Sequence, residues 1–133
     1  MIPAGVRIFA AAAPVDMRRG FIGLSETVRE HLSQDPGNGA LFIFANKRKD
    51  RLKLLWHDRT GLCLLYKSLD RGFFRIPDAA PGAKSVAIDA AEMAAILEGV
   101  QLSAKKMTPR KVAQQARDAA LRAASTDSNH AGA

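Results

Sequence analysis

The densest group of chemically capable side chains is a cluster of cations near the middle of the chain. Lys47, Arg48, Lys49 and Arg51 fall within five residues, and Lys53 follows two positions later. Cations on a hairpin tip are suited to phosphate contacts, because they reach a nucleic-acid backbone from a rigid platform. The cluster therefore predicts a nucleic-acid-binding surface. The alternative is a solvated loop whose charges only discourage aggregation between strand edges.

Three further arginines extend this candidate DNA-binding set. Arg59 falls on the turn at the other end of the same predicted hairpin. Arg18 and Arg19 precede a predicted helix, whose first N–H groups attract anions and could strengthen a phosphate contact. A solvated first helical turn accounts for this arginine pair equally well.

Candidates for catalysis are fewer. Cys63 is the single cysteine, and a buried structural thiol is a simpler interpretation than a nucleophile with a lowered pKa. Asp50, Asp58 and Asp70 could hold a metal for nuclease chemistry, but each falls in a predicted turn, where aspartate bonds the backbone. The sequence has neither a glycine-rich phosphate loop nor zinc-ligand spacing. We therefore expect no metal, no cofactor and no catalysis.

The composition favours a small basic protein with its charge localised. The 133 residues predict one principal domain. The net charge is +7: residues 45–75 carry +6 and residues 104–133 carry +4, whereas residues 1–44 carry none and residues 76–103 carry −3. Localised positive charge favours a polyanionic partner. No apolar run reaches the roughly 18 residues of a membrane span, and a basic signal-peptide start is missing, so we expect a cytoplasmic location.

Hydrophobic patterns predict the elements that position these residues. Short apolar runs predict strands at 6–9, 41–44, 52–57, 62–67, 73–76 and 85–88. Apolar residues spaced by three and four predict a helix over 21–32, with Asp16 as its N-cap. Asp89 and Glu92 predict a capping box that begins a second helix, and Gly99 ends that helix.

The order of these elements predicts an α+β fold. We expect an antiparallel sheet of about five strands packed with two helices over residues 1–100. Residues 101–124 read as a linker and an alanine-rich basic helix that starts at Thr108 and Pro109. Residues 125–133 have the composition of a disordered tail.

The hairpin formed by 52–57 and 62–67 has two candidate registers. A three-residue loop with a bulge at Gly61 pairs Trp56 with Leu64 and Leu54 with Tyr66. A two-residue loop would place Lys53 and His57 among aliphatic side chains. We therefore predict the bulged register.

Apolar residues occupy both faces of the central strands. Phe42, Phe44, Leu55 and Leu65 compete for the core with the residues that alternate with them. Because a single antiparallel sheet buries one face well, either the sheet curls into a barrel or these four residues form a docking patch. The second alternative predicts binding of another protein, or a homo-oligomer.

Several segments, in order, resemble a known family over about residues 2–100. They are Asp16–Phe21, Gly23–Leu24, Leu41–Phe44, Lys49–Trp56, Gly61–Leu64, Lys67–Phe73 and Leu97–Val100. They resemble TnpB, the small accessory transposition protein of the IS66 group of bacterial insertion sequences. The chain departs from this family after Gln101, where a segment rich in Trp and Arg is usual.

The resemblance implies an accessory role in DNA transposition, beside a DDE transposase of the same element. It supplies no catalytic residues. The expected partners are DNA, held by non-specific phosphate contacts, and that transposase. The alternatives that remain open are a protein–protein adaptor without DNA binding and a metal-dependent nuclease that uses the three aspartates.

Overall fold

The structure is a computed structural model that describes residues 5–101, 114, 117–119 and 121. The last five of these residues are helical. The rest of the helix predicted from Thr108 to Ala124, and the predicted tail at 125–133, lie outside the described residues. Every element described below belongs to one compact unit, Met1–Gln101.

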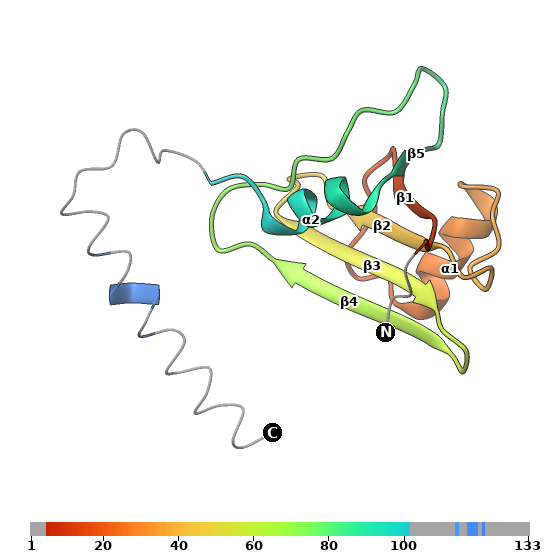
Figure 1. The fold of residues 1–133 in the computed structure, drawn as a ribbon, viewed down its shortest axis with the longest axis horizontal. Helices are drawn as coiled ribbons and strands as arrows, with labels where there is room; N and C mark the ends of the chain where they lie inside the picture. Colours follow the sequence, from red (N-terminus) through yellow and green to blue (C-terminus); the bar gives the residue numbers. More distant parts are fainter. Residues whose placement is uncertain (1–4, 102–113, 115–116, 120, 122–133) are drawn as a thin grey trace. The chain divides into compact units, whose positions relative to one another are not determined.

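Five strands and two helices make up this unit (Figure 1). In chain order they are β1 (Ile8–Ala11), α1 (Phe21–Glu30), β2 (Leu41–Ala45), β3 (Arg51–His57), β4 (Leu62–Ser68), β5 (Ser85–Ile88) and α2 (Ala90–Glu98). The strands form one sheet in the order β4-β3-β2-β1-β5. The predicted five-stranded sheet with two helices is confirmed. Among the described residues, no helix has both the length and the apolar character needed to cross a membrane.

The sheet is mixed, whereas the sequence predicted an antiparallel one. β1 and β2 are parallel, with Ile8 beside Leu41 and Ala10 beside Ile43, and the other strand pairs are antiparallel. A parallel pair needs a long crossover, which α1 and its two connecting loops supply. As a result, β1 and β2 end at the same edge of the sheet.

Helix α1 begins at Phe21, as predicted, but it ends at Glu30 and its N-cap differs from the predicted one. Gly20 is its N-cap and offers no side-chain cap, so the prediction of Asp16 as N-cap is wrong. Asp16 instead accepts hydrogen bonds from Arg18, ahead of the helix. Of the predicted apolar stripe Phe21, Leu24, Val28 and Leu32, the last three are buried, whereas Phe21 is 48% exposed.

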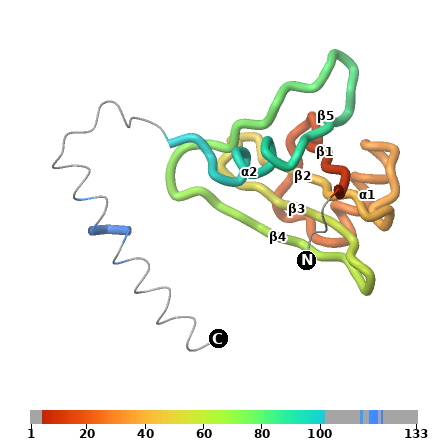
Figure 2. The backbone as a smooth tube through the Cα atoms, in the orientation of Figure 1, coloured from red at the N-terminus to blue at the C-terminus, as the bar shows by residue number. Residues whose placement is uncertain are grey.

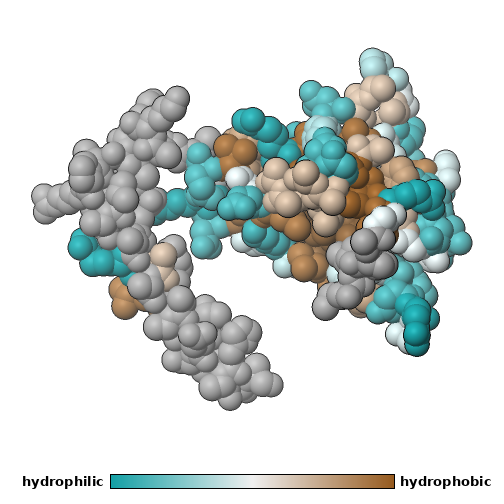
Figure 3. Space-filling model, viewed as in Figure 1, coloured by the Kyte–Doolittle hydropathy of each residue, from teal (hydrophilic) through white to brown (hydrophobic). Residues whose placement is uncertain are grey.

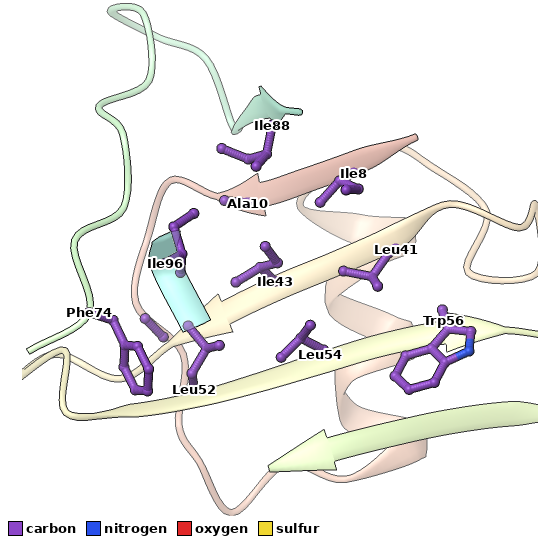
Figure 4. Packing of buried hydrophobic residues seen from close by; sticks show 11 residues of the cluster. Ile8, Ala10, Leu41, Ile43, Leu52, Leu54, Trp56, Phe74, Ile88 and Ile96 are labelled. Carbon is purple, nitrogen blue, oxygen red and sulfur yellow. The ribbon is translucent and has the colours of Figure 1, made fainter. Parts of the chain in front are cut away.

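Each helix covers one face of the sheet (Figures 2 and 4). Leu24 and Val28 of α1 pack on the face that carries Phe42, Phe44 and Leu55. The opposite face packs against α2 and Phe74 through the cluster Ile8, Ala10, Leu41, Ile43, Leu52, Leu54, Trp56, Ile88 and Ile96. A sheet with helices on both faces buries both sets of apolar residues.

This arrangement replaces both alternatives that the sequence left open. The sheet does not curl into a barrel, and Phe42, Phe44 and Leu55 are fully buried. They therefore cannot form an exposed docking patch. Leu65 pairs with Leu54 and so lies on the opposite face, where 43% of it is exposed.

The register of the β3–β4 hairpin is the one that the sequence argument rejected. Lys53 pairs with Tyr66 and Trp56 with Cys63, and the Asp58 N–H donates to the Gly61 carbonyl to close the turn. Lys53 lies on the apolar face that packs against α1, and it is tolerated there because its Nζ donates to the Arg19 carbonyl at 2.8 Å. The same Nζ lies 4.7 Å from the centre of the Tyr66 ring.

The segment after β4 forms no strand at 73–76. Phe73 makes an isolated bridge to Val100, and Phe74 is fully buried beneath α2. The predicted capping box of α2 is confirmed, as is its end at Gly99, which has a φ of +80°. The Lys67 ammonium donates to the Leu97 carbonyl and so ties β4 to α2.

We predict that Gly72→Ala destabilises the fold much more than Gly82→Ala. Both glycines have φ near +80°, so both variants incur the left-handed strain of about 1–2 kcal/mol. A Cβ at Gly72 would also lie 1.9 Å from the Val100 carbonyl oxygen, whereas one at Gly82 meets nothing within 4 Å. We expect about 3–4 kcal/mol lost for Gly72→Ala in urea unfolding. Equal losses for the two variants would contradict this packing.

Candidate functional site

Two basic loops that are far apart in the sequence meet at one edge of the sheet. The first, residues 12–20, follows β1, and the second, residues 46–50, follows β2. The Val15 N–H donates to the Ala45 carbonyl at 2.9 Å and joins the bases of the two loops. We call this end of the sheet the basic edge, and its exposed cations are Arg18, Arg19, Lys47, Arg48, Lys49 and Arg51.

A side-chain brace shapes the second loop. The Asn46 Oδ1 accepts the backbone N–H groups of Asp50 and Arg51 at 3.1 and 3.0 Å. The Asn46 Nδ2 donates to the Asp50 carboxylate at 2.7 Å, and this bond lowers the pKa of Asp50. The loop therefore has a fixed backbone beneath its three exposed cations.

The neighbouring chain also holds this loop in place. The Phe74 N–H donates to the Lys49 carbonyl at 2.7 Å, and the Leu69 N–H donates to the Asp50 carbonyl at 2.9 Å. Lys49 has a φ of +60°, a left-handed conformation that is costly outside glycine and persists where surrounding bonds enforce it. The same segment brings Arg71 and Arg75 to this end of the sheet.

The first loop is organised by Asp16. Its carboxylate accepts the Arg18 backbone N–H at 2.9 Å and forms an ion pair with the Arg18 guanidinium at 2.7 Å. The side-chain bond from Arg18 lowers the pKa of Asp16 to about 2. Asp16 thus neutralises part of the Arg18 charge within the loop, although the Arg18 side chain is 92% exposed.

Arg19 is fixed in a different way. Its Nη1 donates to the Gly23 carbonyl and to the Thr27 hydroxyl, both at 3.3 Å. Its own carbonyl accepts the Lys53 ammonium. Lys53 is 6% exposed, so its charge is used inside the fold and does not reach the basic edge.

Arg59 lies at the other end of the sheet. It occupies the β3–β4 turn, and the seven residues of β3 separate that turn from the second loop by about 23 Å. The structure therefore does not bring Arg59 together with the other candidate cations.

The same strand separates Asp50 from Asp58, so the three candidate aspartates do not gather around one ion. Within the described residues, no group of three or more acidic, His or Cys side chains is placed to hold a metal. Asp58 instead accepts the N–H groups of Thr60 and Gly61 in the turn, and these bonds lower its pKa to about 2.

Cys63 lies beside that carboxylate. Its Sγ is 3.4 Å from the Asp58 Oδ2. Burial raises the pKa of the Cys63 thiol, and the hydrogen bond to Asp58 raises it further. A thiol with a raised pKa is a poor nucleophile at neutral pH.

Sequence reasoning missed one cation at the basic edge. Lys84 precedes β5, whose Ser85 pairs with Ala11 at the end of β1. The Lys84 carbonyl accepts the Ala12 N–H at 2.9 Å. Residues 76–103 carry a net charge of −3, so charge by segment gave no sign of this lysine. A prediction of the antiparallel β1–β5 pairing would have placed Lys84 beside the end of β1 and so at the basic edge.

Comparisons with known proteins agree on one family. A family profile described as IS66 Orf2 like protein matches residues 6–107. An uncharacterized protein, y4hO, from Sinorhizobium fredii is 41% identical over 102 residues, which cover 75% of this chain and 87% of the relative. A second uncharacterized protein from that bacterium, y4jC, is 36% identical over 107 residues, which cover 80% and 90%. No solved structure matches the chain.

The Asp16 carboxyl should titrate far below an ordinary aspartate. Its folded pKa of about 2 lies below the ordinary aspartate pKa of 3.8, so its bond to Arg18 contributes stability above pH 3.8 that is lost as the pH falls through about 2. Carboxyl titration by NMR should give a midpoint near 2. Arg18→Gln should move that midpoint towards 3.8 and leave Asp58 near 2. An unchanged Asp16 midpoint would refute the role of Arg18.

Proposed function

The chain belongs to the family of IS66 Orf2 like proteins, accessory proteins of bacterial insertion sequences, and we propose that it is a non-catalytic DNA-binding member. In this proposal the basic edge holds the phosphate backbone of DNA during transposition. The observation that carries it is the convergence of two basic loops, 12–20 and 46–50, at the end of the parallel β1–β2 pair.

The availability of the charges supports this role. The ion pair with Asp16 neutralises part of the Arg18 charge. Lys47, Arg48 and Lys49 are exposed, and the nearby Asp50 carboxylate is hydrogen-bonded to Asn46. Figure 3 shows hydrophobic residues over the middle of the visible face and hydrophilic residues around its rim. Uncompensated cations on a fixed loop bind phosphates with little dependence on base sequence.

We predict that replacing Lys47, Arg48 and Lys49 by Gln weakens duplex DNA binding and its salt dependence together. Each lost phosphate contact should reduce the slope of log K against log salt by about 0.9. Fluorescence anisotropy at several salt concentrations measures both quantities. Arg48→Gln and Arg59→Gln form a matched pair, because each removes one exposed hairpin arginine from opposite ends of the sheet.

Only Arg48→Gln should weaken binding. Equal effects of these two single variants, or a wild-type protein that binds no duplex at low salt, would overturn the proposal. Asn46→Ala adds a test of loop rigidity, because it keeps every cation and removes the brace. It should lower the affinity and leave the salt slope unchanged.

A second candidate function is docking of the transposase on strand β4. Among the residues that the structure describes, this strand is an edge of the sheet, and one side of its backbone has no neighbouring strand there. Leu65 and Tyr66 are 43% and 49% exposed there. An exposed apolar edge strand is a template for adding a strand from a partner.

For this docking mode, Leu65→Glu is the informative variant. It should reduce capture of the purified transposase of the same element and leave DNA binding by the basic edge unchanged. Leu65→Val is the control, because it keeps an apolar side chain on the strand. Undiminished capture by Leu65→Glu would rule out this edge as the docking site. Sedimentation of the protein alone shows whether a second copy occupies the edge instead.

A further inference from the structure

Two adjoining cavities lie at the basic edge, on either side of residues 11–14. The larger has a volume of about 440 Å³, and the smaller has a volume of about 300 Å³. Ala11, Ala12, Ala13 and Pro14 line both. These small residues form the wall that the two cavities share.

The larger cavity combines apolar walls with cations that have spare donors. Arg19 and Lys84 line it, together with Thr27 and His31. Nη1 donates both of the hydrogen bonds that the Arg19 side chain makes. A guanidinium has five N–H donors, so the Nε and Nη2 donors of Arg19 find no acceptor among the described residues.

The one acidic residue that lines the larger cavity, Asp16, forms its hydrogen bonds and its ion pair with Arg18 and none with Arg19, although the Arg19 charge also lowers the pKa of Asp16. The Asp16 carboxylate is already bonded to the backbone and guanidinium of Arg18. Arg19 is held in place by Thr27, which is itself buried. A fixed guanidinium with free donors beside an apolar wall favours a ligand that has both an anionic and an apolar part.

The smaller cavity supplies more positive charge. Lys47 and Lys49 of the second basic loop line it, and Asp78 is its single acidic residue. The brace from Asn46 and the bond from Phe74 fix the backbone of this loop. Residues 11–14 therefore have cations on both sides, Arg19 in the larger cavity and Lys47 and Lys49 in the smaller one.

We propose that the two cavities bind one phosphorylated nucleotide unit. Its sugar and base occupy the larger cavity, and its phosphate groups lie between Arg19 and the two loop lysines. The larger cavity falls within the roughly 300–1,000 Å³ that is typical of small-molecule sites. The unit can come from an unpaired DNA strand end or from a free nucleotide.

The strand-end source rests on the proposed DNA binding, whereas the free-nucleotide source does not. A paired base inside a duplex cannot enter a cavity, because its edge and faces are occupied. An overhang that reaches the larger cavity would therefore add to the contacts of the basic edge. DNA with an unpaired end should bind more tightly than blunt DNA.

The test compares three probes by fluorescence anisotropy. They are a blunt duplex, the same duplex with a short single-stranded overhang, and deoxyadenosine monophosphate as a competitor, with inorganic phosphate as its comparator. We expect the overhang to bind about tenfold tighter than the blunt end, the effect of one added charge-assisted hydrogen bond. We also expect the nucleotide to compete better than phosphate.

Two variants separate the cavities from the basic edge. Arg19→Lys keeps the charge and removes the guanidinium fork, and Ala83→Phe fills the larger cavity, which Ala83 lines. Both should abolish the preference for the overhang. Ala83→Phe should also leave the affinity for the blunt duplex unchanged, because Ala83 is not one of the cations of the basic edge. Ala80→Phe is the matched control, because Ala80 is exposed in the same linker and lines neither cavity.

The outcomes distinguish this inference from the proposed function. Equal binding of blunt and overhanging DNA, with no competition by the nucleotide, overturns the inference and leaves duplex binding standing. Equal competition by phosphate and nucleotide also overturns it, because it shows a simple anion site. If neither DNA binds but NMR shows the nucleotide at Arg19 and Thr27, the inference stands and the proposed function fails.

Discussion

The parallel hydrogen bonding between β1 and β2 determines where the other elements lie. Because the two strands run in the same direction, the chain must cross back between them, and α1 makes that crossing over one face. The remaining face is then left to α2 and Phe74. The same pairing brings the loops after both strands to one edge, where each contributes cations. Burial of both sheet faces and convergence of the basic loops thus have a single cause.

A buried lysine links this edge to the hairpin beside it. Lys53 lies on the apolar face of β3, yet its ammonium bonds the Arg19 carbonyl and faces the Tyr66 ring. A buried charge costs little when it finds such partners. The bond also fixes the backbone of the first basic loop just before α1 begins. Lys53 is therefore compatible with burial, and it positions the first basic loop through its bond to the Arg19 carbonyl.

Local patterns predicted most elements, and non-local pairing limited the rest. The capping box at Asp89 and the apolar stripe of α1 follow from spacing along the chain alone. The direction of β1 relative to β2 depends on a crossover of about thirty residues, so the sequence did not predict that loops 12–20 and 46–50 meet at one edge. The β3–β4 register failed for a related reason. Burial of Lys53 in this register is tolerated because its Nζ donates a hydrogen bond to the carbonyl of Arg19, which is distant in the sequence.

The acidic residues at the basic edge explain why its lysines stay uncompensated. Asp16 is occupied by Arg18, and Asp50 is occupied by Asn46 and by its own loop. Both carboxylates are therefore committed to holding loop backbones in shape. Their pKa values are lowered by these bonds, so they remain ionised and keep the brace at neutral pH. Rigid loops and available cations thus arise together, because Asp16 and Asp50 are used to fix the loops that carry the cations.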